Sequence, residues 1–247
     1  MVRFPGVNGH ERMRVVISQP AALLARPTYG MAQVDSILRL RGGTARRWID
    51  GYVRNRKTYP PIVRLEHTGE ELVTWGEFSE VRLLSEFRDE GALVARMRPA
   101  VEALRDEFRV LYPLAYARPL LEPQGRELVM KVQERVGLEK RLRLIVVRNG
   151  QLTLATEASA FVDSVDYVDG VARRMNPLPD LDEVWLDPMR RFGEPIVRSV
   201  PTAVIAEQIR AGDDEEMIAD LYELSRRQVW QAIRYELLRG RDAPKAA

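Results

Sequence analysis

The feature that most constrains the fold of this chain is a pair of glycines, Gly42-Gly43, between two short runs of residues with helical apolar spacing. Glycine adopts backbone angles that other residues avoid, so the pair favours a sharp reversal of the chain. The run before the glycines carries apolar residues that one face of a helix would bury. These residues are Ala32, Val34, Ile37 and Leu38. The pattern predicts two short helices joined by a tight turn.

The run after the glycines predicts a helix with one apolar and one basic face. Thr44 is the expected N-cap, because its hydroxyl can accept a hydrogen bond from a free amide of the first turn. Ala45, Trp48 and Ile49 lie at positions i, i+3 and i+4, so they share the buried face. Arg46-Arg47 then points outward, which is the arrangement that a helix needs to lie in the major groove of DNA.

Basic residues are concentrated in this part of the chain. Between Arg39 and Arg64 there are eight basic residues and a single acid, a net charge of +7, whereas the whole chain carries +2. Contacts of lysine and arginine with phosphates dominate protein–DNA affinity, and arginine also binds guanine with two hydrogen bonds. We therefore interpret residues 29–52 as a helix-turn-helix that binds double-stranded DNA, the alternative being a solvated basic face without a ligand. The predicted DNA-binding residues are Arg39, Arg41, Thr44, Arg46, Arg47, Tyr52, Arg54, Arg56, Lys57, Arg64 and His67.

The segment after the second helix is expected to form a β-hairpin, or wing, beside it. Tyr59-Pro60-Pro61 ends the helical region, since proline restricts its predecessor and cannot donate a backbone hydrogen bond. Residues 62–65 and 72–75 are rich in β-prone side chains and flank Thr68-Gly69-Glu70, which suits a hairpin loop. Two of the predicted DNA-binding residues would lie on this hairpin near the phosphate backbone: Arg64 and His67.

Composition narrows the class of protein. Of the 247 residues, 45% are apolar and 30% are charged, as expected of a globular protein with a sizeable core. The absence of cysteine excludes disulfides, thiol catalysis and the commonest structural zinc sites. No run of about 18 apolar residues and no secretory pattern occurs, so we expect a cytoplasmic protein without a membrane partner.

Signals for catalysis or for a bound cofactor are weak. The sequence shows no nucleophile–base pair, no glycine-rich phosphate loop and no metal-ligand spacing, so we expect neither an enzyme nor a bound cofactor or metal. Asp163, Asp166 and Asp169 are three residues apart and would share a face if this segment were helical. A solvated acidic face explains them better than a metal site, because no other ligand cluster supports coordination.

Turn and proline signals divide the chain into an arm and three units. Residues 1–28 form the arm, 29–116 a winged helix-turn-helix, 117–179 a small unit containing β-structure, and 180–247 a C-terminal helical domain. Asn149-Gly150 predicts a hairpin turn inside the third of these segments. The expected fold class is α+β, mainly helical.

The C-terminal domain is expected to contain three short helices, which begin near Thr202, Asp213 and Ser225. Three helices of this kind can form a second helix-turn-helix. The segment from Asp180 onward has 14 acids and 10 bases, which disfavours DNA, and Trp230 suits a core or an interface. We therefore favour a protein-binding or dimerising role for this domain.

Two groups of motifs resemble known families. Tyr29-Gly30-Met31-Ala32 with residues 44–48 is similar to the first half of MerR-like DNA-binding heads, although Asp35 stands where a small residue is usual and Arg39 where glycine is common. The C-terminal motifs resemble a small helical domain of bacterial antitoxins that are encoded beside PIN-like toxins. These motifs are Asp187-Pro188, Gly193–Arg198, Thr202, Ala211-Gly212 and Ile233–Glu236.

The combination resembles a VapB-type antitoxin, with residues 78–81 and 112–115 also fitting the pattern. The resemblance implies a homodimeric repressor that binds the promoter of its own operon and masks a PIN-like toxic ribonuclease. Arg46 would read bases, with Thr44 and Arg47 contacting bases or the DNA backbone. In such a dimer, two recognition helices would enter successive major grooves roughly 34 Å apart on an inverted repeat. The alternative is a MerR-type regulator that senses a small ligand through the middle unit.

Overall fold

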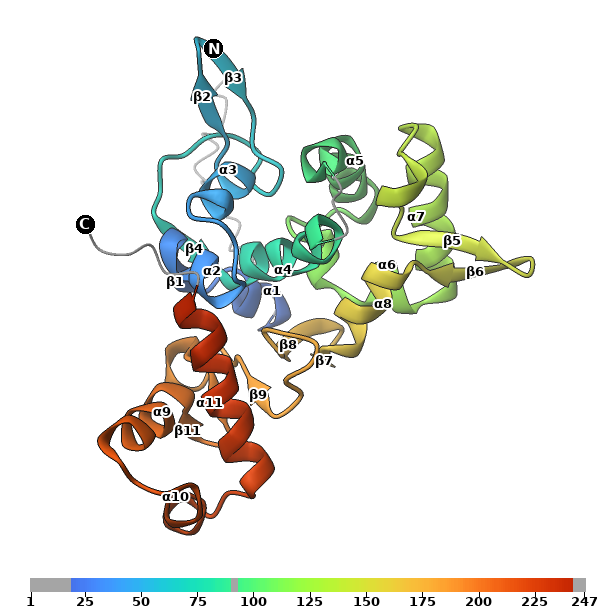
Figure 1. Cartoon of the computed structure of the whole chain (residues 1–247). Coiled ribbons are helices and arrows are strands. Elements are labelled where there is room, and N and C mark those ends of the chain that lie inside the picture. The colour runs from blue at the N-terminus through green and yellow to red at the C-terminus, as the bar shows by residue number, and fades with distance from the viewer. Residues whose placement is uncertain (1–18, 90–92, 242–247) are drawn as a thin grey trace, which may run out of the picture.

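The computed structural model describes residues 19–89 and 93–241 and has an α+β architecture of helices and small antiparallel sheets (Figure 1). The predicted fold class is confirmed at this level. The first part of the chain begins with a short helix and a strand that leads directly into two further short helices. Its elements are α1 (Gln19–Leu24), β1 (Pro27–Gly30), α2 (Met31–Ile37), α3 (Thr44–Ile49), β2 (Tyr52–Arg54), β3 (Lys57–Tyr59) and β4 (Leu72–Thr74).

The two short helices lie where the sequence predicts them, and the chain reverses between them. Gly43 has φ 78°, and Arg39 has φ 52°, so the position where MerR-like heads often have glycine does adopt the left-handed conformation. Val34 and Ile37 are buried as expected. Ala32 is exposed, which corrects its predicted place in the core.

The predicted hairpin of residues 62–75 is wrong. Residues 62–71 contain no strand, and β4 pairs with β1 in an antiparallel sheet. The hairpin is formed earlier, by β2 and β3, directly after α3. It projects from one end of the molecule, at the top of Figure 1.

A long buried helix, α4, crosses the centre of the molecule and is followed by shorter helices (Figure 1). The helical spacing of apolar residues in 78–87 and 93–108 predicts two helices separated by Gly91. Helical structure forms in both segments, and Gly91 lies outside the described residues. The same spacing places Arg82 on the exposed side of its helix, but Arg82 is only 1% exposed and its guanidinium pairs with Glu86. The elements are α4 (Trp75–Asp89), η1 (Val94–Met97), α5 (Arg98–Phe108), η2 (Pro113–Ala115), α6 (Ala117–Leu121) and α7 (Pro123–Arg135).

The middle of the chain contains two hairpins around one helix. Asn149 and Gly150 form the turn of the first, as predicted, with φ 51° and 75°. The spacing of Phe161, Val162, Val165 and Val168 predicts a helix that continues toward Gly170. Residues 165–168 form a strand instead, so Asp163, Asp166 and Asp169 do not share a helical face. The elements are η3 (Lys140–Leu142), β5 (Ile145–Arg148), β6 (Gln151–Leu154), α8 (Thr156–Asp163), β7 (Val165–Val168) and β8 (Val171–Met175).

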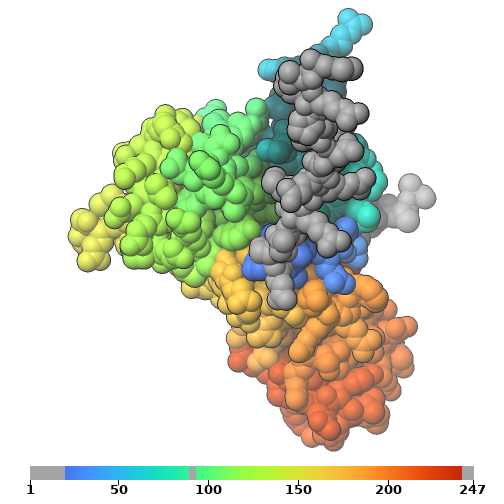
Figure 2. Space-filling view, turned by 180° about the vertical axis from the view of Figure 1, so that it is seen from behind, coloured from blue at the N-terminus to red at the C-terminus, as the bar shows by residue number. Residues whose placement is uncertain are grey.

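The last part of the chain forms a separate lobe, at the lower end of Figure 2. Its three predicted helices are present, after a small antiparallel sheet. Asp214 caps the second helix by accepting a hydrogen bond from the Glu216 amide at 2.7 Å. The elements are β9 (Val184–Trp185), η4 (Arg191–Gly193), β10 (Ile196–Val197), β11 (Val200–Pro201), α9 (Thr202–Ala211), α10 (Glu215–Tyr222) and α11 (Arg226–Arg241).

Two hydrophobic clusters hold the molecule together. The larger one runs from Leu24 to Leu186, so it continues across the expected boundary between residues 116 and 117. The smaller one runs from Leu181 to Tyr235, within the expected C-terminal domain. Of the expected arm, residues 19–28 contain α1 and the first half of β1, and residues 1–18 lie outside the described part of the chain.

The C-terminal lobe contacts the N-terminal elements through a few polar groups. The Tyr29 hydroxyl donates a hydrogen bond to the Gly193 carbonyl at 2.6 Å. Gly193 has φ 81°, and a β-carbon there would come within 2.8 Å of the Tyr29 hydroxyl oxygen, so this contact requires glycine. Arg239 of α11 donates to the Ser36 hydroxyl of α2 at 3.0 Å. The lobe is therefore joined to the strand and helix that precede α3.

Candidate nucleic-acid interface

The helix α3 exposes two arginines on the face opposite to its buried one. Ala45 and Ile49 are fully buried, and Trp48 packs half-buried against the larger cluster. Arg46 and Arg47 are exposed. The apolar stripe predicted from the sequence is therefore confirmed, and it leaves both guanidinium groups accessible to a ligand.

The start of α3 is capped by Asp35 of α2, which corrects the prediction that Thr44 is the N-cap. Asp35 accepts hydrogen bonds from the amides of Gly43 at 2.6 Å and Ala45 at 2.7 Å. Burial raises the pKa of the Asp35 carboxyl, although these two amide bonds act in the opposite direction. Thr44 is buried, and its hydroxyl accepts a hydrogen bond from Arg47 Nη2 at 2.8 Å. Asp35 thus fixes the turn between the two helices.

The hairpin of β2 and β3 extends the basic surface beyond α3. Tyr52 is paired with Tyr59 and Arg54 with Lys57, so these four side chains share one face of the hairpin. The tyrosine rings stack with centroids 4.5 Å apart, and Lys57 Nζ lies 5.3 Å from the Tyr59 centroid. The turn residues Asn55 and Arg56 both have positive φ, 51° and 61°, as a tight two-residue hairpin turn requires.

Arg64 is buried and bound to acids, so it is not available to DNA as predicted. Its Nε lies 2.7 Å from Glu77 Oε1, and its Nη1 lies 3.1 Å from Asp50 Oδ1. It also donates to the Thr68 hydroxyl and to the Leu72 carbonyl, each at 2.7 Å. Burial acts to lower the pKa of the guanidinium, but the contacts with Glu77 and Asp50 more than offset this and raise it.

The acids around Arg64 fix the segment of residues 62–71 against α3. Asp50, directly after α3, accepts hydrogen bonds from the amides of Thr68 at 2.7 Å and Gly69 at 2.9 Å. His67 is exposed, and its Nδ1 lies 2.8 Å from the Asp50 carbonyl oxygen. Because this polar network holds the segment in place, the segment needs no strand pairing to be ordered.

One acid of this segment faces the basic surface. Glu71 forms an ion pair with Arg46, and both side chains are largely exposed, at 64% and 45%. The hydrogen bond from Arg46 holds the pKa of the Glu71 carboxyl below its usual value and raises that of the Arg46 guanidinium. An exposed pair of this kind is weak and can be exchanged for another anion.

The structure brings most of the predicted site residues to one surface. Arg41, Arg46 and Arg47 lie at α3, and three further basic residues are exposed on the adjacent hairpin, Arg54, Arg56 and Lys57. Arg39 is half-buried. We refer to the six exposed residues as the basic face; it excludes Arg64, and Thr44 lies beneath it.

Three residues that shape this site were missed as site residues by the sequence analysis: Asp35, Tyr59 and Glu71. From the sequence, Asp35 was recognised only as a departure from the MerR-like pattern and not as a helix cap. Asn55 favours a tight turn, so it could have indicated the hairpin of β2 and β3 and therefore the position of Tyr59 on it. Nothing in the sequence near Glu71 indicates that it reaches Arg46, which lies 25 residues earlier.

In the described part of the chain, neither a candidate metal cluster nor a membrane-spanning helix accompanies this surface. Within residues 19–89 and 93–241, no group of three or more His, Cys, Asp or Glu side chains could hold a metal ion. In the same part of the chain, no helix is long and apolar enough to cross a membrane.

Comparisons with known proteins find similarity over most of this chain. Residues 184–235 match a family described as "Protein of unknown function (DUF433)". The uncharacterized protein Rv2308 of Mycobacterium tuberculosis is 37% identical over 221 residues, which cover 87% of this chain and 92% of that protein. The crystal structure of Rv2018 from Mycobacterium tuberculosis superimposes with a TM-score of 0.68 at 26% identity, covering 84% of this chain and 97% of that one.

Proposed function

The chain belongs to the family of the uncharacterized protein Rv2308, and we propose that it is an antitoxin and DNA-binding repressor that neutralises a PIN-type ribonuclease and regulates its own operon. One observation carries the DNA-binding part of this proposal. The helix α3 buries one side and exposes Arg46 and Arg47 on the other, next to a projecting basic hairpin. A recognition helix beside a wing has this arrangement.

On this proposal α2, the turn and α3 act as a helix-turn-helix, and β2 and β3 act as its wing. Arg46 and Arg47 contact base edges in the major groove, where arginine binds guanine with two hydrogen bonds. The hairpin residues Arg54, Arg56 and Lys57 contact phosphates, which adds affinity without sequence preference. A homodimer would present two such helices to an inverted repeat.

The C-terminal lobe is the part that we propose for partner proteins, both the second protomer and the toxin. Large apolar side chains on α10 and α11 are at least half exposed, which is unusual unless they are covered by another protein. The matching DUF433 family occurs in proteins associated with toxin–antitoxin pairs. The exposed residues are Met217, Leu221, Trp230 and Leu237.

The DNA-binding part is tested by a fluorescence anisotropy titration with the DNA upstream of this protein's own gene and a scrambled duplex of equal length. We expect Arg46→Ala to weaken binding to the upstream duplex about 10- to 100-fold and to reduce the preference over the scrambled one. Arg135→Ala is the matched control, because Arg135 is also an exposed arginine with a glutamate partner and lies on the distant helix α7. Weak binding to both duplexes that Arg46→Ala leaves unchanged would contradict the proposal.

The antitoxin part is tested with a PIN-type ribonuclease encoded beside this gene. The full-length chain should inhibit RNA cleavage by that enzyme in a one-to-one titration. Trp230→Asp should abolish inhibition while α3 still binds DNA, because Trp230 belongs to α11 of the C-terminal lobe, whereas the basic face belongs to α3 and the hairpin of β2 and β3 at the other end of Figure 1. Full inhibition by Trp230→Asp would show that the toxin binds at another surface. Absence of inhibition by the wild type would reject the antitoxin role.

A further inference from the structure

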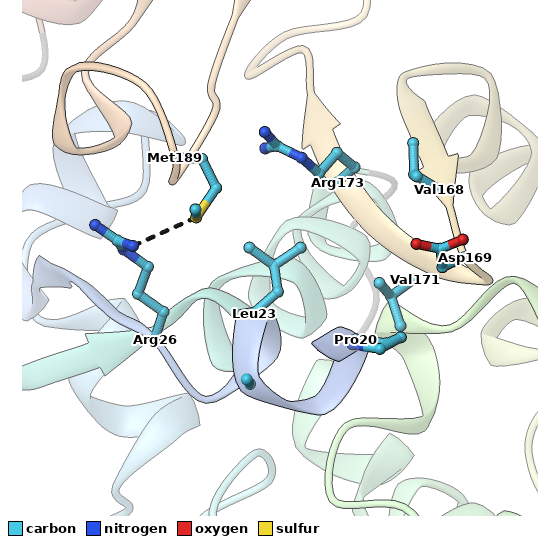
Figure 3. Close-up of a pocket in the computed structure, with 9 residues that line it drawn as sticks. Pro20, Leu23, Arg26, Val168, Asp169, Val171, Arg173 and Met189 are labelled. Atoms are coloured by element: carbon cyan, nitrogen blue, oxygen red, sulfur yellow. Dashed lines mark hydrogen bonds between the residues drawn. The ribbon is translucent and has the colours of Figure 1, made fainter. Parts of the chain in front are cut away.

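A cavity of about 650 Å³ lies outside the basic face and outside the proposed partner surface. It is bounded by α1, by the hairpin of β7 and β8, and by the segment after β9 (Figure 3). The helix α1 is distant in the sequence from the other two segments. Cavities that bind small molecules in proteins have volumes of this order.

The floor of the cavity is apolar. Leu23 of α1 projects into its middle, and Val171 of β8 and Pro20 lie beside it (Figure 3). Met189 closes one side. A ligand that fills this space would therefore bury an apolar body against aliphatic side chains.

Two guanidinium groups flank Met189. Arg26 Nη1 has the Met189 sulfur as its hydrogen-bond partner, at 3.3 Å, and a thioether is a weak acceptor. No carboxylate pairs with Arg26 in the part of the chain that the structure describes. Arg173, by contrast, pairs with Asp187, which also accepts a hydrogen bond from the Met189 amide at 2.8 Å. Arg26 is therefore the cation of this cavity that is free to bind an anion.

The cavity also has one acid that a ligand would meet. Asp169 lies at the tip of the hairpin, in an exposed turn with φ 51°, on the opposite side of the cavity from Arg26 (Figure 3). Its charge disfavours an anion on that side. An anionic group would consequently be directed to the side of Arg26, and the apolar part of the ligand would lie over Leu23 and Val171.

We propose that this cavity binds a small carboxylic acid with an apolar body. Its carboxylate accepts two hydrogen bonds from the Arg26 guanidinium and displaces the Met189 sulfur, since charge-assisted bidentate bonds are much stronger than a bond to a thioether. The ligand then joins α1 to the segment that leads to Gly193, where the C-terminal lobe contacts Tyr29. This site goes beyond the proposed function and does not depend on DNA binding.

The proposal is tested by isothermal titration calorimetry on the full-length chain with 4-phenylbutyrate, its neutral amide and 4-phenylbutylamine as probes. We expect saturable binding of the carboxylate that is at least tenfold tighter than that of the amide, and no saturable binding of the amine. Arg26→Gln should remove this preference. Arg135→Gln, which removes the same charge from α7, should leave it unchanged.

A second variant tests the position of the site without changing a charge. Ala22 is exposed at the edge of the cavity, so Ala22→Trp should fill the space and abolish binding while the protein stays folded. Equal affinity for the carboxylate and the amide, carboxylate binding that Arg26→Gln leaves intact, or no binding of any probe up to millimolar concentration would each overturn the proposal. Any of these results leaves the DNA titration unaffected, so the two proposals fail separately.

Discussion

The segment of residues 62–71 and the helix α3 lie side by side and use arginine in opposite ways. Arg64 of the first is 9% exposed and is surrounded by Asp50, Glu77 and backbone carbonyls. Arg46 of the second is largely exposed and has one exposed acid as its partner. Both belong to the same basic stretch of the sequence.

The difference shows that a count of basic residues does not separate structural cations from binding ones. A buried guanidinium is stable only when acids and carbonyl groups satisfy it on every side, which leaves none of its donors for a ligand. An exposed one keeps its donors in exchange with water and can bind phosphate or a base edge. Burial of the guanidinium, not its charge, therefore decides which arginines belong to the basic face.

The sharpest test of this comparison is Arg64→Ala. The substitution leaves the buried carboxylates of Asp50 and Glu77 without their guanidinium partner, and breaking a buried ion pair in this way costs about 3–5 kcal/mol. The free energy of unfolding, measured by urea denaturation followed by circular dichroism, should fall by that amount. Arg47→Ala should change it by less than about 0.5 kcal/mol, because Arg47 is exposed.

Arg64→Lys separates charge from geometry at the same position. Lysine keeps the positive charge but cannot reach Glu77, Asp50 and Leu72 with a planar fork of donors. We therefore expect a stability between those of the wild type and Arg64→Ala. If both Arg64 variants were as stable as Arg47→Ala, the distinction between the two regions would be refuted.

A second buried pair extends the comparison to pH. Glu80 is fully buried and lies 3.2 Å from Arg105, and it also accepts a hydrogen bond from the Leu114 amide at 3.2 Å. Burial raises the pKa of the Glu80 carboxyl to about 7, although Arg105 acts in the opposite direction. The folded protein therefore holds a proton on Glu80 between about pH 4.5 and 7, where the unfolded chain has released it.

The stability contributed by Glu80 is thus present below pH 4.5 and is lost as the pH rises to 7. Relative to Glu80→Gln, the wild type should lose on the order of 2 kcal/mol of unfolding free energy between pH 5 and 7. Urea denaturation at several pH values measures this difference. Glu102→Gln changes an exposed glutamate of α5, so its unfolding free energy should depend on pH in the same way as that of the wild type. If the unfolding free energy of Glu80→Gln also changed with pH as that of the wild type does, Glu80 would be ionised in the folded state over this pH range.

The parts of the site that the sequence predicts correctly depend on local spacing. The bounds of α3, its buried stripe and its exposed arginines follow from the positions of Ala45, Trp48 and Ile49 within one helical turn and a half. The turn at Asn149-Gly150 follows from two adjacent residues. In these cases the residues that determine the structure are neighbours in the sequence.

The parts that the sequence does not predict depend on residues that meet only in the fold. Asp35 caps α3 because the turn brings its carboxylate to amides eight and ten residues later. Arg64 is buried because Asp50 and Glu77, fourteen and thirteen residues away, converge on it. Glycine in Thr68-Gly69-Glu70 favoured a hairpin there, whereas the hairpin turn uses Asn55 and Arg56 in a conformation that arginine seldom adopts.

The smallest expected effect lies at the contact between the two regions, the ion pair of Glu71 with Arg46. If Arg46 binds DNA, its guanidinium must exchange this carboxylate for a phosphate or a base, so Glu71→Gln should strengthen binding to the upstream duplex about two- to fivefold. Glu70→Gln is the matched control, since it removes the same charge from the neighbouring exposed residue. The gain should disappear in the background of Arg46→Ala, because the effect acts through that side chain. If Glu70→Gln and Glu71→Gln increased the affinity equally, the gain would come from the change in net charge and not from loss of the ion pair. If Glu71→Gln bound DNA more weakly, the carboxylate would position Arg46 for DNA instead of competing with it.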